Sequence, residues 1–412
     1  MNSSAPPRPA PGGRALLFVL VLSVSALTFT SAQESSEPHV DARSRQVEYA
    51  GPGREDPEPE TPNEVLVAYF GPDDPDHPVG GDLWLASSLA VEEANRAGGF
   101  RGVPFRLIPA WSEDPWGTGV AKLARAVYDD GVWAVIGSID GASTHLAEQV
   151  VAKARLTLIA PAGTDKTVNY ANVAWMFSCL PSDDRWAELL AEALEGEIGR
   201  HPFTLITTTD HDSRAATAEL RGSLDRRGVG PLHHLELAAG AEDLDDVAER
   251  VAKSDSEAVV ILSGPVDTAR LVVALRERRS NLTLFGGPSV GRRAFLERAD
   301  TASDGVRFPL LCDPAAATSA FVRNFESRFG RRADCPTVQA YDATRLLIAA
   351  IRDAGLNRAR IRDSVEALSP WLGEAGAVEF GPVGQNRRAV RLARIAEGGK
   401  VVVSGDEPLP SQ

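Results

Sequence analysis

Two clusters of small polar residues follow two short apolar runs, and both have the composition of a ligand-binding loop. The first is GAST, Gly141–Thr144, after the run VWAVIGS, and the second is PAGT, Pro161–Thr164, after LTLIA. The first cluster begins a predicted helix, whose free N–H groups and partial positive charge favour a carboxylate or a phosphate. Small residues also leave space beside those groups. We therefore predict that a small solute binds where the two runs end.

The two clusters offer complementary hydrogen-bonding groups. In the first, the backbone amides of Gly141 and Ala142 and the hydroxyls of Ser143 and Thr144 are donors for an anion. In the second, the carbonyl of Ala162, the backbone of Gly163 and the hydroxyl of Thr164 present acceptors for an ammonium group. The alternative is that Ser143 only caps its helix.

Three tryptophans lie in or beside the loops that follow the predicted strands. Trp116, in the turn EDPWGTG, is the best candidate to line a cleft, and Trp84 and Trp111 are further candidates. Tryptophan rings stack on aromatic or aliphatic ligands. The alternative for all three is packing in the core or a place on the surface.

Residues with catalytic potential are present, but their spacing does not predict an enzyme. The segment GPSVG, Gly287–Gly291, lacks the spacing of a nucleophile elbow. His145 and His211 each have the chemistry of a general base, yet single polar positions on loops and helices are common. His233 and His234 point to opposite faces of one predicted strand and cannot share a metal. No zinc or phosphate-loop motif is found, so we expect no enzyme activity, no metal and no cofactor.

Composition excludes some classes of partner and leaves others open. The chain has 412 residues, 43% hydrophobic and 24% charged, with a net charge of −14. This acidic balance argues against nucleic acid and anionic membrane surfaces as partners. Of the three cysteines, at least one is unpaired within the chain, and Cys312 and Cys335 flank one predicted helix and are candidates for a disulfide. Cys179 has no predicted role.

The N-terminus has the features of an export signal. Arg8 and Arg14 precede the apolar run of residues 15–27, and Thr30 and Ala32 fit a small-residue cleavage site. We expect a signal peptide over residues 1–32, with an uncleaved anchor as the alternative. Residues 33–63 are rich in Pro and Glu, without periodicity, and are predicted to be a disordered spacer. The mature protein is expected to be exported, periplasmic or extracellular.

From residue 64 onward, short β-rich runs alternate with amphipathic segments of helical period. The alternation runs to about residue 181 and then restarts, which predicts two α/β units with mostly parallel sheets flanked by helices. Three more helices and short strands follow. We expect these later elements to pack back onto the two α/β units and complete them.

The order and spacing of several segments resemble type I periplasmic solute-binding proteins of the leucine/isoleucine/valine-binding kind. The segments are AVEEANRAGGFRGVPFRLI, VWAVIGSIDGASTHLAEQVVAKARLTLIAPAGT, FVRNFESRFGRR with TVQAYDATRLL, and GAVEFGPVGQNRRAVRLARI with GGKVV. The resemblance implies two lobes, residues 64–181 plus 312–372 and residues 182–311 plus 373–405. It implies three crossing segments, near Leu180–Asp183, Val306–Pro314 and Trp371–Ala377.

The resemblance also implies a function. Residues matching Gly141, Ala142 and Ser143 hold the ligand carboxylate in this family, and those matching Ala162 and Thr164 hold its amino and carboxylate groups. The expected protein is a monomer that captures an amino-acid-like or carboxylate solute by hinge closure and delivers it to an ABC permease in the inner membrane. The alternative is a sensor with the same clamp that signals to a membrane partner.

The sequence departs from the family pattern at three positions. Gly141 stands where a Ser or Thr is common, uncharged Ser289 stands where an acid pairs with the ligand ammonium, and Pro265 replaces an aromatic residue. Asp183, Asp210 and Asp267 are the candidates for the missing charge; of these we include Asp183, with Ser289, in the expected site.

Overall fold

A computed structural model describes residues 48–60, 62–111, 115–171, 173–199 and 201–404. The predicted signal peptide and the first part of the predicted spacer lie outside the described residues. Among the described helices, none combines the length and the apolar character needed to cross a bilayer.

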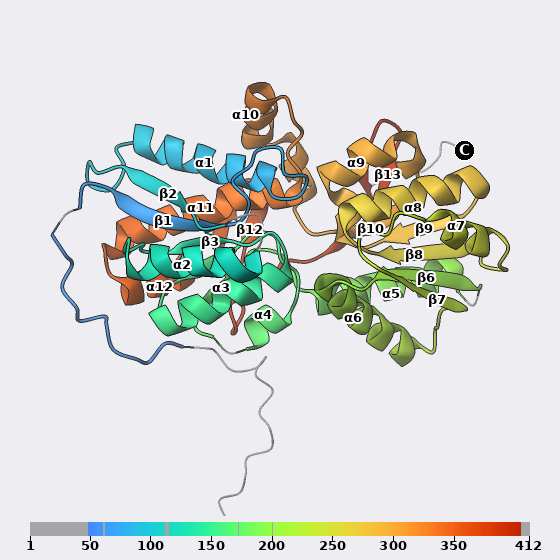
Figure 1. The fold of residues 1–412 in the computed structure, drawn as a ribbon, viewed down its shortest axis with the longest axis horizontal. Helices are drawn as coiled ribbons and strands as arrows, with labels where there is room; N and C mark the ends of the chain where they lie inside the picture. Colours follow the sequence, from blue (N-terminus) through green and yellow to red (C-terminus); the bar gives the residue numbers. More distant parts are fainter. Residues whose placement is uncertain (1–47, 61, 112–114, 172, 200, 405–412) are drawn as a thin grey trace, which may run out of the picture. The chain divides into compact units, whose positions relative to one another are not determined.

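The first lobe is built on a five-stranded sheet in which every pairing is parallel. The strand order is β2-β1-β3-β4-β5. Its elements, in chain order, are β1 (Val65–Phe70), α1 (Gly81–Arg96), β2 (Phe105–Pro109), η2 (Pro115–Gly119), α2 (Val120–Tyr128), β3 (Val135–Gly137), α3 (Gly141–Ala154), β4 (Leu158–Ala160), α4 (Thr167–Tyr170) and β5 (Met176–Ser178). Each helix returns the chain to the start of another parallel strand, as the alternating pattern predicts, and α2 carries it from β2 past β1 to β3 (Figure 1).

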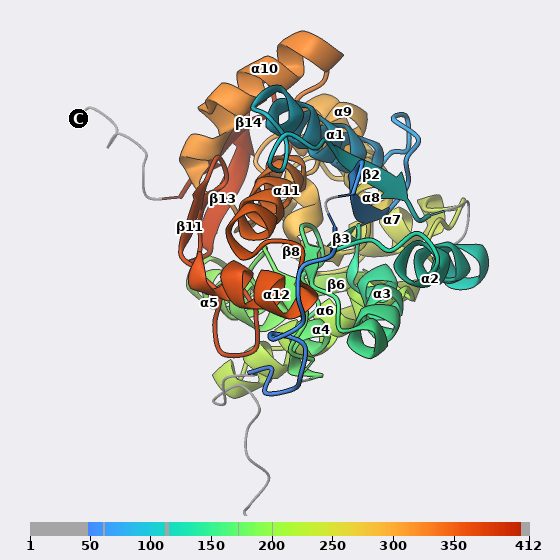
Figure 2. The ribbon, with the colours of Figure 1, turned by 90° about the vertical axis from the view of Figure 1, so that its left-hand side faces the viewer.

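Strand β1 shows why helices must cover both faces of this sheet. Val65, Val67 and Tyr69 pack with α1 and with the later helix α11 (Cys335–Ala354). Ala68 and Phe70, which point to the other face, pack with α2 and α3. A strand with both faces apolar is stable only when both are covered. Figure 2 shows α1 and α11 lying side by side over one face.

The second lobe contains a seven-stranded sheet in the order β14-β13-β10-β9-β8-β6-β7. Helices α5 and α6 pack on one face, and α7, α8 and α9 pack on the other. The elements are α5 (Asp183–Ile198), β6 (Phe203–Thr208), α6 (His211–Arg227), β7 (His233–Leu237), α7 (Asp245–Ala252), β8 (Ala258–Leu262), α8 (Pro265–Arg278), β9 (Thr283–Gly286), η3 (Pro288–Gly291), α9 (Arg293–Ala299), η4 (Asp300–Ser303) and β10 (Arg307–Leu310). Only the pairings of β13 with β10 and with β14 are antiparallel.

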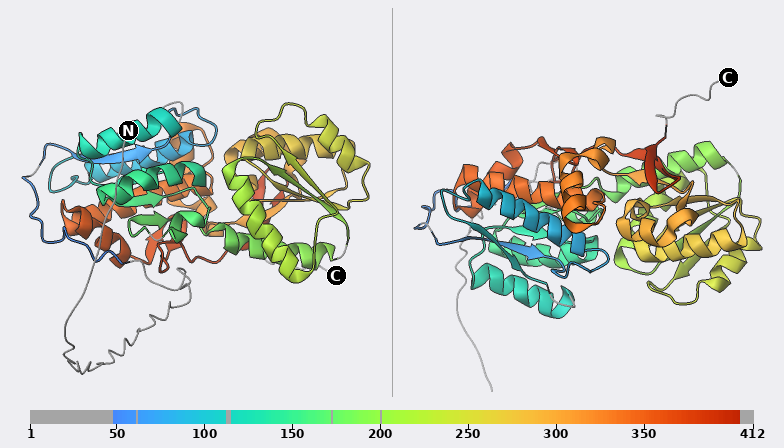
Figure 3. Two further views of the ribbon diagram at one scale, coloured as in Figure 1. Left: turned by 60° about the horizontal axis from the view of Figure 1, so that its bottom comes forward. Right: turned by 90° about the horizontal axis from the view of Figure 1, so that it is seen from above.

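The last quarter of the chain contributes to both lobes (Figure 3). Helices α11 and α12 join the first lobe, and β13 and β14 complete the second sheet. The elements are η5 (Pro314–Thr318), α10 (Ala320–Phe329), α11, α12 (Arg358–Ala367), β11 (Trp371–Gly373), β12 (Gly376–Val378), β13 (Arg391–Ala396) and β14 (Lys400–Val403). This return of the chain is the one expected from the sequence.

The third crossing lies later in the chain than predicted. Residues Trp371–Val378 form the β11–β12 hairpin, and the backbone N–H groups of Glu374 and Ala375 donate to the buried carboxylate of Asp342 in α11, at 2.9 and 2.7 Å. The hairpin is therefore attached to the first lobe. The side-chain amide of Asn386 still bonds to the carbonyl of Cys179, at 2.6 Å, and the chain enters the second sheet only at β13. The boundary predicted at residue 373 falls inside this hairpin.

Part of the predicted spacer is packed against the first lobe. Residues 48–60 contain no helix or strand, but Arg54 forms an ion pair with Asp363 of α12 at 2.6 Å. The ring of Tyr49 lies 4.5 Å from that of Trp175, and the Asn357 side chain donates to the carbonyl of Gly53. The prediction of disorder is therefore wrong for these residues, because composition alone does not show long-range partners.

The cysteine pair left open by the sequence is a disulfide. Cys312 and Cys335 are bonded, and Cys179 is a buried free thiol. The bond joins the segment after β10 to the first residue of α11 and closes a loop with a sequence separation of 23. A loop of that size corresponds to about 3 kcal/mol of stabilisation through the unfolded chain. The disulfide thus fastens a crossing segment to the first lobe.

Candidate functional site

A cavity of about 370 Å³ lies at the carboxyl ends of the strands of both sheets. Residues that follow β3, β4 and β5 line it from the first lobe, and residues that follow β6, β8 and β9 line it from the second. Much of the wall is apolar, with Val79, Ile139, Leu180, Trp186, Leu262 and Phe308 among the lining residues. This is where ligands bind in open α/β sheets.

The structure brings only some of the predicted site residues to the cavity wall. Ala162, Thr164 and Ser289 line it. Gly141, Ala142, Ser143 and Thr144 form the first turn of α3, which begins beside the lining residue Asp140, and Gly163 packs against that turn. Trp116 is 67% exposed and lines a separate surface groove with His145 and Gln149. Trp111 is buried in the first lobe and Trp84 packs against its core, so neither lines the cavity.

The hydroxyls in the first turn of α3 are engaged within that turn. The N-cap of the helix is Asp140, which accepts a hydrogen bond from the backbone N–H of Ser143 at 2.8 Å. The Ser143 hydroxyl bonds to Asp140 and to Ser138, and the Thr144 hydroxyl donates to the carbonyl of Asp140. Both side chains are buried. The helix cap predicted as the alternative role of Ser143 is therefore provided by Asp140.

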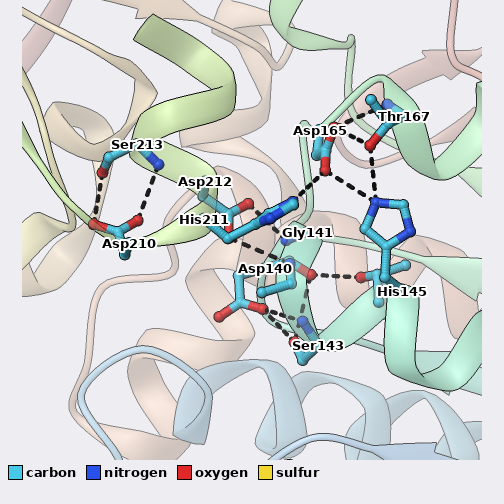
Figure 4. Close-up of polar contacts among 12 residues, drawn as sticks. Asp140, Gly141, Ser143, His145, Asp165, Thr167, Asp210, His211, Asp212 and Ser213 are labelled. Atoms are coloured by element: carbon cyan, nitrogen blue, oxygen red, sulfur yellow. Dashed lines mark hydrogen bonds and ion pairs between the residues drawn. The ribbon is translucent and has the colours of Figure 1, made fainter.

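The remaining free amides of this turn bind a carboxylate from the other lobe. The N–H groups of Gly141 and Ala142 donate to the two oxygens of Asp212, at 2.7 and 3.3 Å (Figure 4). Burial and the nearby charge of Asp140 raise the pKa of Asp212 to about 6. A side chain of α6 thus occupies the place that the sequence assigns to a ligand carboxylate.

This contact explains why glycine stands at position 141. A Cβ atom there would lie 2.5 Å from Cβ of Asp165 and 2.6 Å from Oδ1 of Asp212. The Ser or Thr that is common in the resembled family does not fit beside these groups. Gly141 and Asp212 are therefore a matched pair.

Asp183, a predicted partner for a ligand ammonium, is almost completely buried beside the cavity. Its carboxylate accepts a hydrogen bond from the indole N–H of Trp186, at 3.0 Å, and its backbone N–H donates to the carbonyl of Thr164. Burial raises the pKa of Asp183 to about 7, and the charges of Asp165 and Asp212 act in the same direction. Of the other two acids considered, Asp210 caps α6 and lines the cavity, whereas Asp267 bonds to the backbone of Gly240.

Among the contacts between the lobes, two sets lie on different elements. The first set, which we name the α3–α6 contact, comprises Asp212 with the amides of α3, His211 with Asp165, and Lys166 with Glu219. The second, which we name the arginine contact, comprises Arg292 with Asp334 at 2.7 Å and Arg293 with Asp82. Arg292 also donates to the carbonyl of Val79.

The α3–α6 contact contains a cluster of two histidines and an acid. Nε2 of His145 and Nε2 of His211 lie 3.1 and 2.7 Å from the same oxygen of Asp165 (Figure 4). Hydrogen bonds to Asp165 and to Glu148 raise the pKa of His145 to about 9. Burial favours the neutral form of Asp165, but the two histidines and Thr167 outweigh it and hold its pKa well below the usual range.

Sequence reasoning missed Asp212, Trp186 and Asp165 as site residues. Asp212 lies two residues after Asp210, in the first turn of the helix that follows β6, which is the position equivalent to Ala142 after β3. That equivalence of the two lobes is the signal that would have identified it. For Trp186 no comparable signal exists, because it lies within an ordinary amphipathic helix.

Comparisons with known proteins agree with this geometry. A family model described as periplasmic binding protein matches residues 67–400. The leucine-, isoleucine-, valine-, threonine-, and alanine-binding protein of Pseudomonas aeruginosa is 19% identical over 279 residues, which is 67% of this chain and 74% of that protein. The chemotactic signal transduction system substrate-binding protein BasB of Halobacterium salinarum is 24% identical over 197 residues, 46% of this chain and 47% of that protein.

Solved structures show the same fold. The branched-chain amino acid transporter substrate-binding protein LivJ of Streptococcus pneumoniae, in complex with isoleucine, has a TM-score of 0.73 at 18% identity, covering 82% of this chain and 97% of that one. An ABC transporter substrate-binding protein of Desulfitobacterium hafniense, complexed with Leu, has a TM-score of 0.68 at 20% identity, covering 82% and 99%. With two lobes, a cavity at the strand ends of both and a family match over most of its length, the chain belongs to the periplasmic binding protein family.

Proposed function

We propose that this protein is an exported receptor, not an enzyme, that binds a small amino-acid-like or carboxylate solute between its lobes and delivers it to an ABC permease. The observation that carries the proposal is the cavity at the carboxyl ends of both sheets. Its volume of about 370 Å³ is in the range of small-molecule sites, and such sites are mostly apolar with a few directed polar groups. The relatives named for leucine, isoleucine and related amino acids support this solute class.

A second function keeps the same clamp and changes the partner. The relative from Halobacterium salinarum is named for a chemotactic signal transduction system, which supports a sensor that signals to a membrane protein. Ligand binding alone does not distinguish the two roles. The two roles are distinguished by the partner that recognises the solute-bound form, which is a permease in one case and a signalling protein in the other.

Asp212 makes the solute's carboxylate subsite testable. Because the amides of Gly141 and Ala142 already bind Asp212, a solute carboxylate must displace that side chain to reach them. This displacement lowers the affinity for the solute, and a variant without the Asp212 side chain does not have to make it. We therefore expect Asp212→Ala to bind its amino acid about tenfold more tightly than the wild type, a change of about 1.4 kcal/mol.

The experiment is a thermal-shift screen of the chain against amino acids, amides and small carboxylates, followed by calorimetric titration of the best solute. A solute at a hundred times its Kd adds about 2.7 kcal/mol of stability. Thr164→Ala, which removes a hydroxyl at the cavity wall, is expected to weaken binding about fivefold, and Trp116→Ala, outside the cavity, to leave it within twofold. If Asp212→Ala instead weakens binding, Asp212 contacts the solute directly, as a partner for its ammonium group.

A further inference from the structure

Three side chains with metal-binding atoms meet at the edge of the α3–α6 contact. His145 comes from α3, Asp165 from the segment between β4 and α4, and His211 from the start of α6. One nitrogen or oxygen atom from each lies within 4.8 Å of the other two. Asp165 and His145 belong to the first lobe and His211 to the second, so the cluster spans the lobes (Figure 4).

Neighbouring groups hold two of the three side chains in place. Oε2 of Glu148 lies 2.9 Å from Nδ1 of His145, and Nε2 faces Oδ2 of Asp165 at 3.1 Å and the hydroxyl of Thr167 at 2.9 Å. The backbone N–H and the hydroxyl of Thr167 donate to Oδ1 of Asp165, at 2.8 and 2.7 Å, which leaves Oδ2 directed at the histidines. A carboxylate on the far nitrogen of a histidine is the usual support of a metal ligand, because it fixes the ring and increases its basicity.

The facing atoms need positive charge between them. If the Nδ1–H of a neutral His145 donates to Glu148, its Nε2 lone pair points at the negatively charged oxygen of Asp165. The Thr167 hydroxyl, 2.9 Å from this nitrogen, is one donor within reach, and a proton or a metal ion between Nε2 and Asp165 relieves the repulsion directly. A metal ion satisfies Asp165 and both histidines at once, and the nearby carboxylates of Glu148 and Asp212 favour a cation there.

We propose that His145, Asp165 and His211 bind one divalent transition metal ion of the zinc class, as a bridge between the lobes. Two imidazoles and one carboxylate suit zinc and its neighbours, whereas magnesium and calcium prefer oxygen ligands alone. The surface groove lined by Trp116, His145 and His211 leaves room for water as a fourth ligand.

The two distances to Asp165 fit such an ion after a small movement, and the two histidine nitrogens lie within 4.8 Å of each other. Tetrahedral zinc with bonds of about 2.0 Å separates its ligand atoms by about 3.3 Å. The distance from His145 to Asp165 is already 3.1 Å, and His211 must move away from Asp165 by about 0.6 Å. The side chain of His211 is 48% exposed and lies in the first turn of α6, so it has space to move. Because one ligand comes from the second lobe, the metal binds the closed arrangement and favours it.

The test uses the full chain after removal of metal with EDTA, and the probe is Zn²⁺ titrated calorimetrically at about pH 8, where protons compete less. We expect one site with a micromolar or lower Kd. His145→Ala and His211→Ala should each weaken binding at least tenfold, and Glu148→Gln, at a positioning residue, by about tenfold. His233→Ala, at an exposed histidine of β7, is the matched control and should change nothing.

A second measurement separates a metal site from a merely structural role. Co²⁺ in place of Zn²⁺ should give visible absorption bands that are lost in His211→Ala, a variant whose exposed position preserves folding. X-ray scattering should show a smaller radius of gyration with Zn²⁺ in the wild type and not in His211→Ala. The proposal is overturned if Zn²⁺ does not saturate one site, if His211→Ala binds it as tightly as the wild type, or if Ca²⁺ binds equally well. None of these outcomes depends on which solute fills the cavity.

Discussion

The arginine contact and the α3–α6 contact join the same two lobes with different chemistry. In the arginine contact, guanidinium groups meet carboxylates with little exposure, 12% and 5% for Arg292 and Asp334. Guanidinium groups stay protonated at any pH that a folded protein tolerates. In the α3–α6 contact, the proposed ligands compete with partners that are already present: a solute carboxylate would compete with Asp212, and a metal ion would compete with the protons of the histidines. One side is thus built to hold the lobes together, and the other to respond to what binds.

The largest effect is expected at Asp334, the centre of the arginine contact. Its carboxylate pairs with Arg292 and accepts hydrogen bonds from the backbone of Arg293 and from Thr337, whose helix it caps. Burial alone raises the pKa of Asp334, but Arg292 and these hydrogen bonds outweigh it and hold the pKa below its usual value. Asp334→Ala leaves Arg292 buried without its acid, and we expect a loss of about 3–5 kcal/mol in urea unfolding.

The control for Asp334→Ala is an exposed ion pair. Glu249 of α7 pairs with Lys253, the C-cap residue one turn later, and both are exposed. Glu249→Ala should leave the urea midpoint unchanged, since exposed pairs contribute little. If Asp334→Ala also leaves it unchanged, the arginine contact does not hold the lobes, and the contrast between the two sides fails.

The next largest effect is a pH dependence that originates at Asp183, beside the cavity and bonded to Thr164. Its pKa of about 7 in the folded protein exceeds its value in the unfolded chain, because burial disfavours the charge. The unfolded chain therefore loses this proton first as pH rises, and stability falls between about pH 4 and pH 7. Asp183→Asn keeps an acceptor for Trp186 and removes the titration.

The measurement is the difference in unfolding free energy between Asp183→Asn and the wild type, followed from about pH 5 to pH 8. As the pH rises over this range, the unfolding free energy of Asp183→Asn should increase relative to that of the wild type by on the order of 3 kcal/mol. A constant difference over this range contradicts the raised pKa. A solute ammonium that pairs with Asp183 should also release a proton near neutral pH, which calorimetry in two buffers detects.

Much of the fold could be predicted from the sequence because its signals are local. The apolar run at β1 and the helical spacing in α1, closed by glycine at position 98, each lie within a window of about twenty residues. The clusters at 141–144 and 161–164 follow β3 and β4 as predicted, and the parallel order of the strands brings them to one edge. The resemblance to a family, read from several such segments, is confirmed by the family match.

What could not be predicted depends on pairs of residues that are distant in the sequence. Gly141 and Asp212 are separated by 71 positions, and only the folded chain shows that one leaves room for the other. The hairpin at 371–378 has ordinary strand character, and its attachment to Asp342 determines which lobe it joins. Trp116 illustrates the converse, since a residue at a favourable turn faces a surface groove outside the cavity. Local patterns position the elements, and side-chain partners decide the site.

The smallest effect is expected at Lys166, the ion pair within the α3–α6 contact. Lys166 pairs with Glu219 of α6 across the lobes, with side-chain exposures of 25% and 23%. Because water reaches both groups, Lys166→Ala should cost at most about 1 kcal/mol in urea unfolding, and less at high salt. This loss is several times smaller than that of Asp334→Ala, although both pairs join the same two lobes. A loss equal to that of Asp334→Ala, and insensitive to salt, would mean that the α3–α6 contact also holds the lobes permanently, and then neither solute nor metal could control their separation through it.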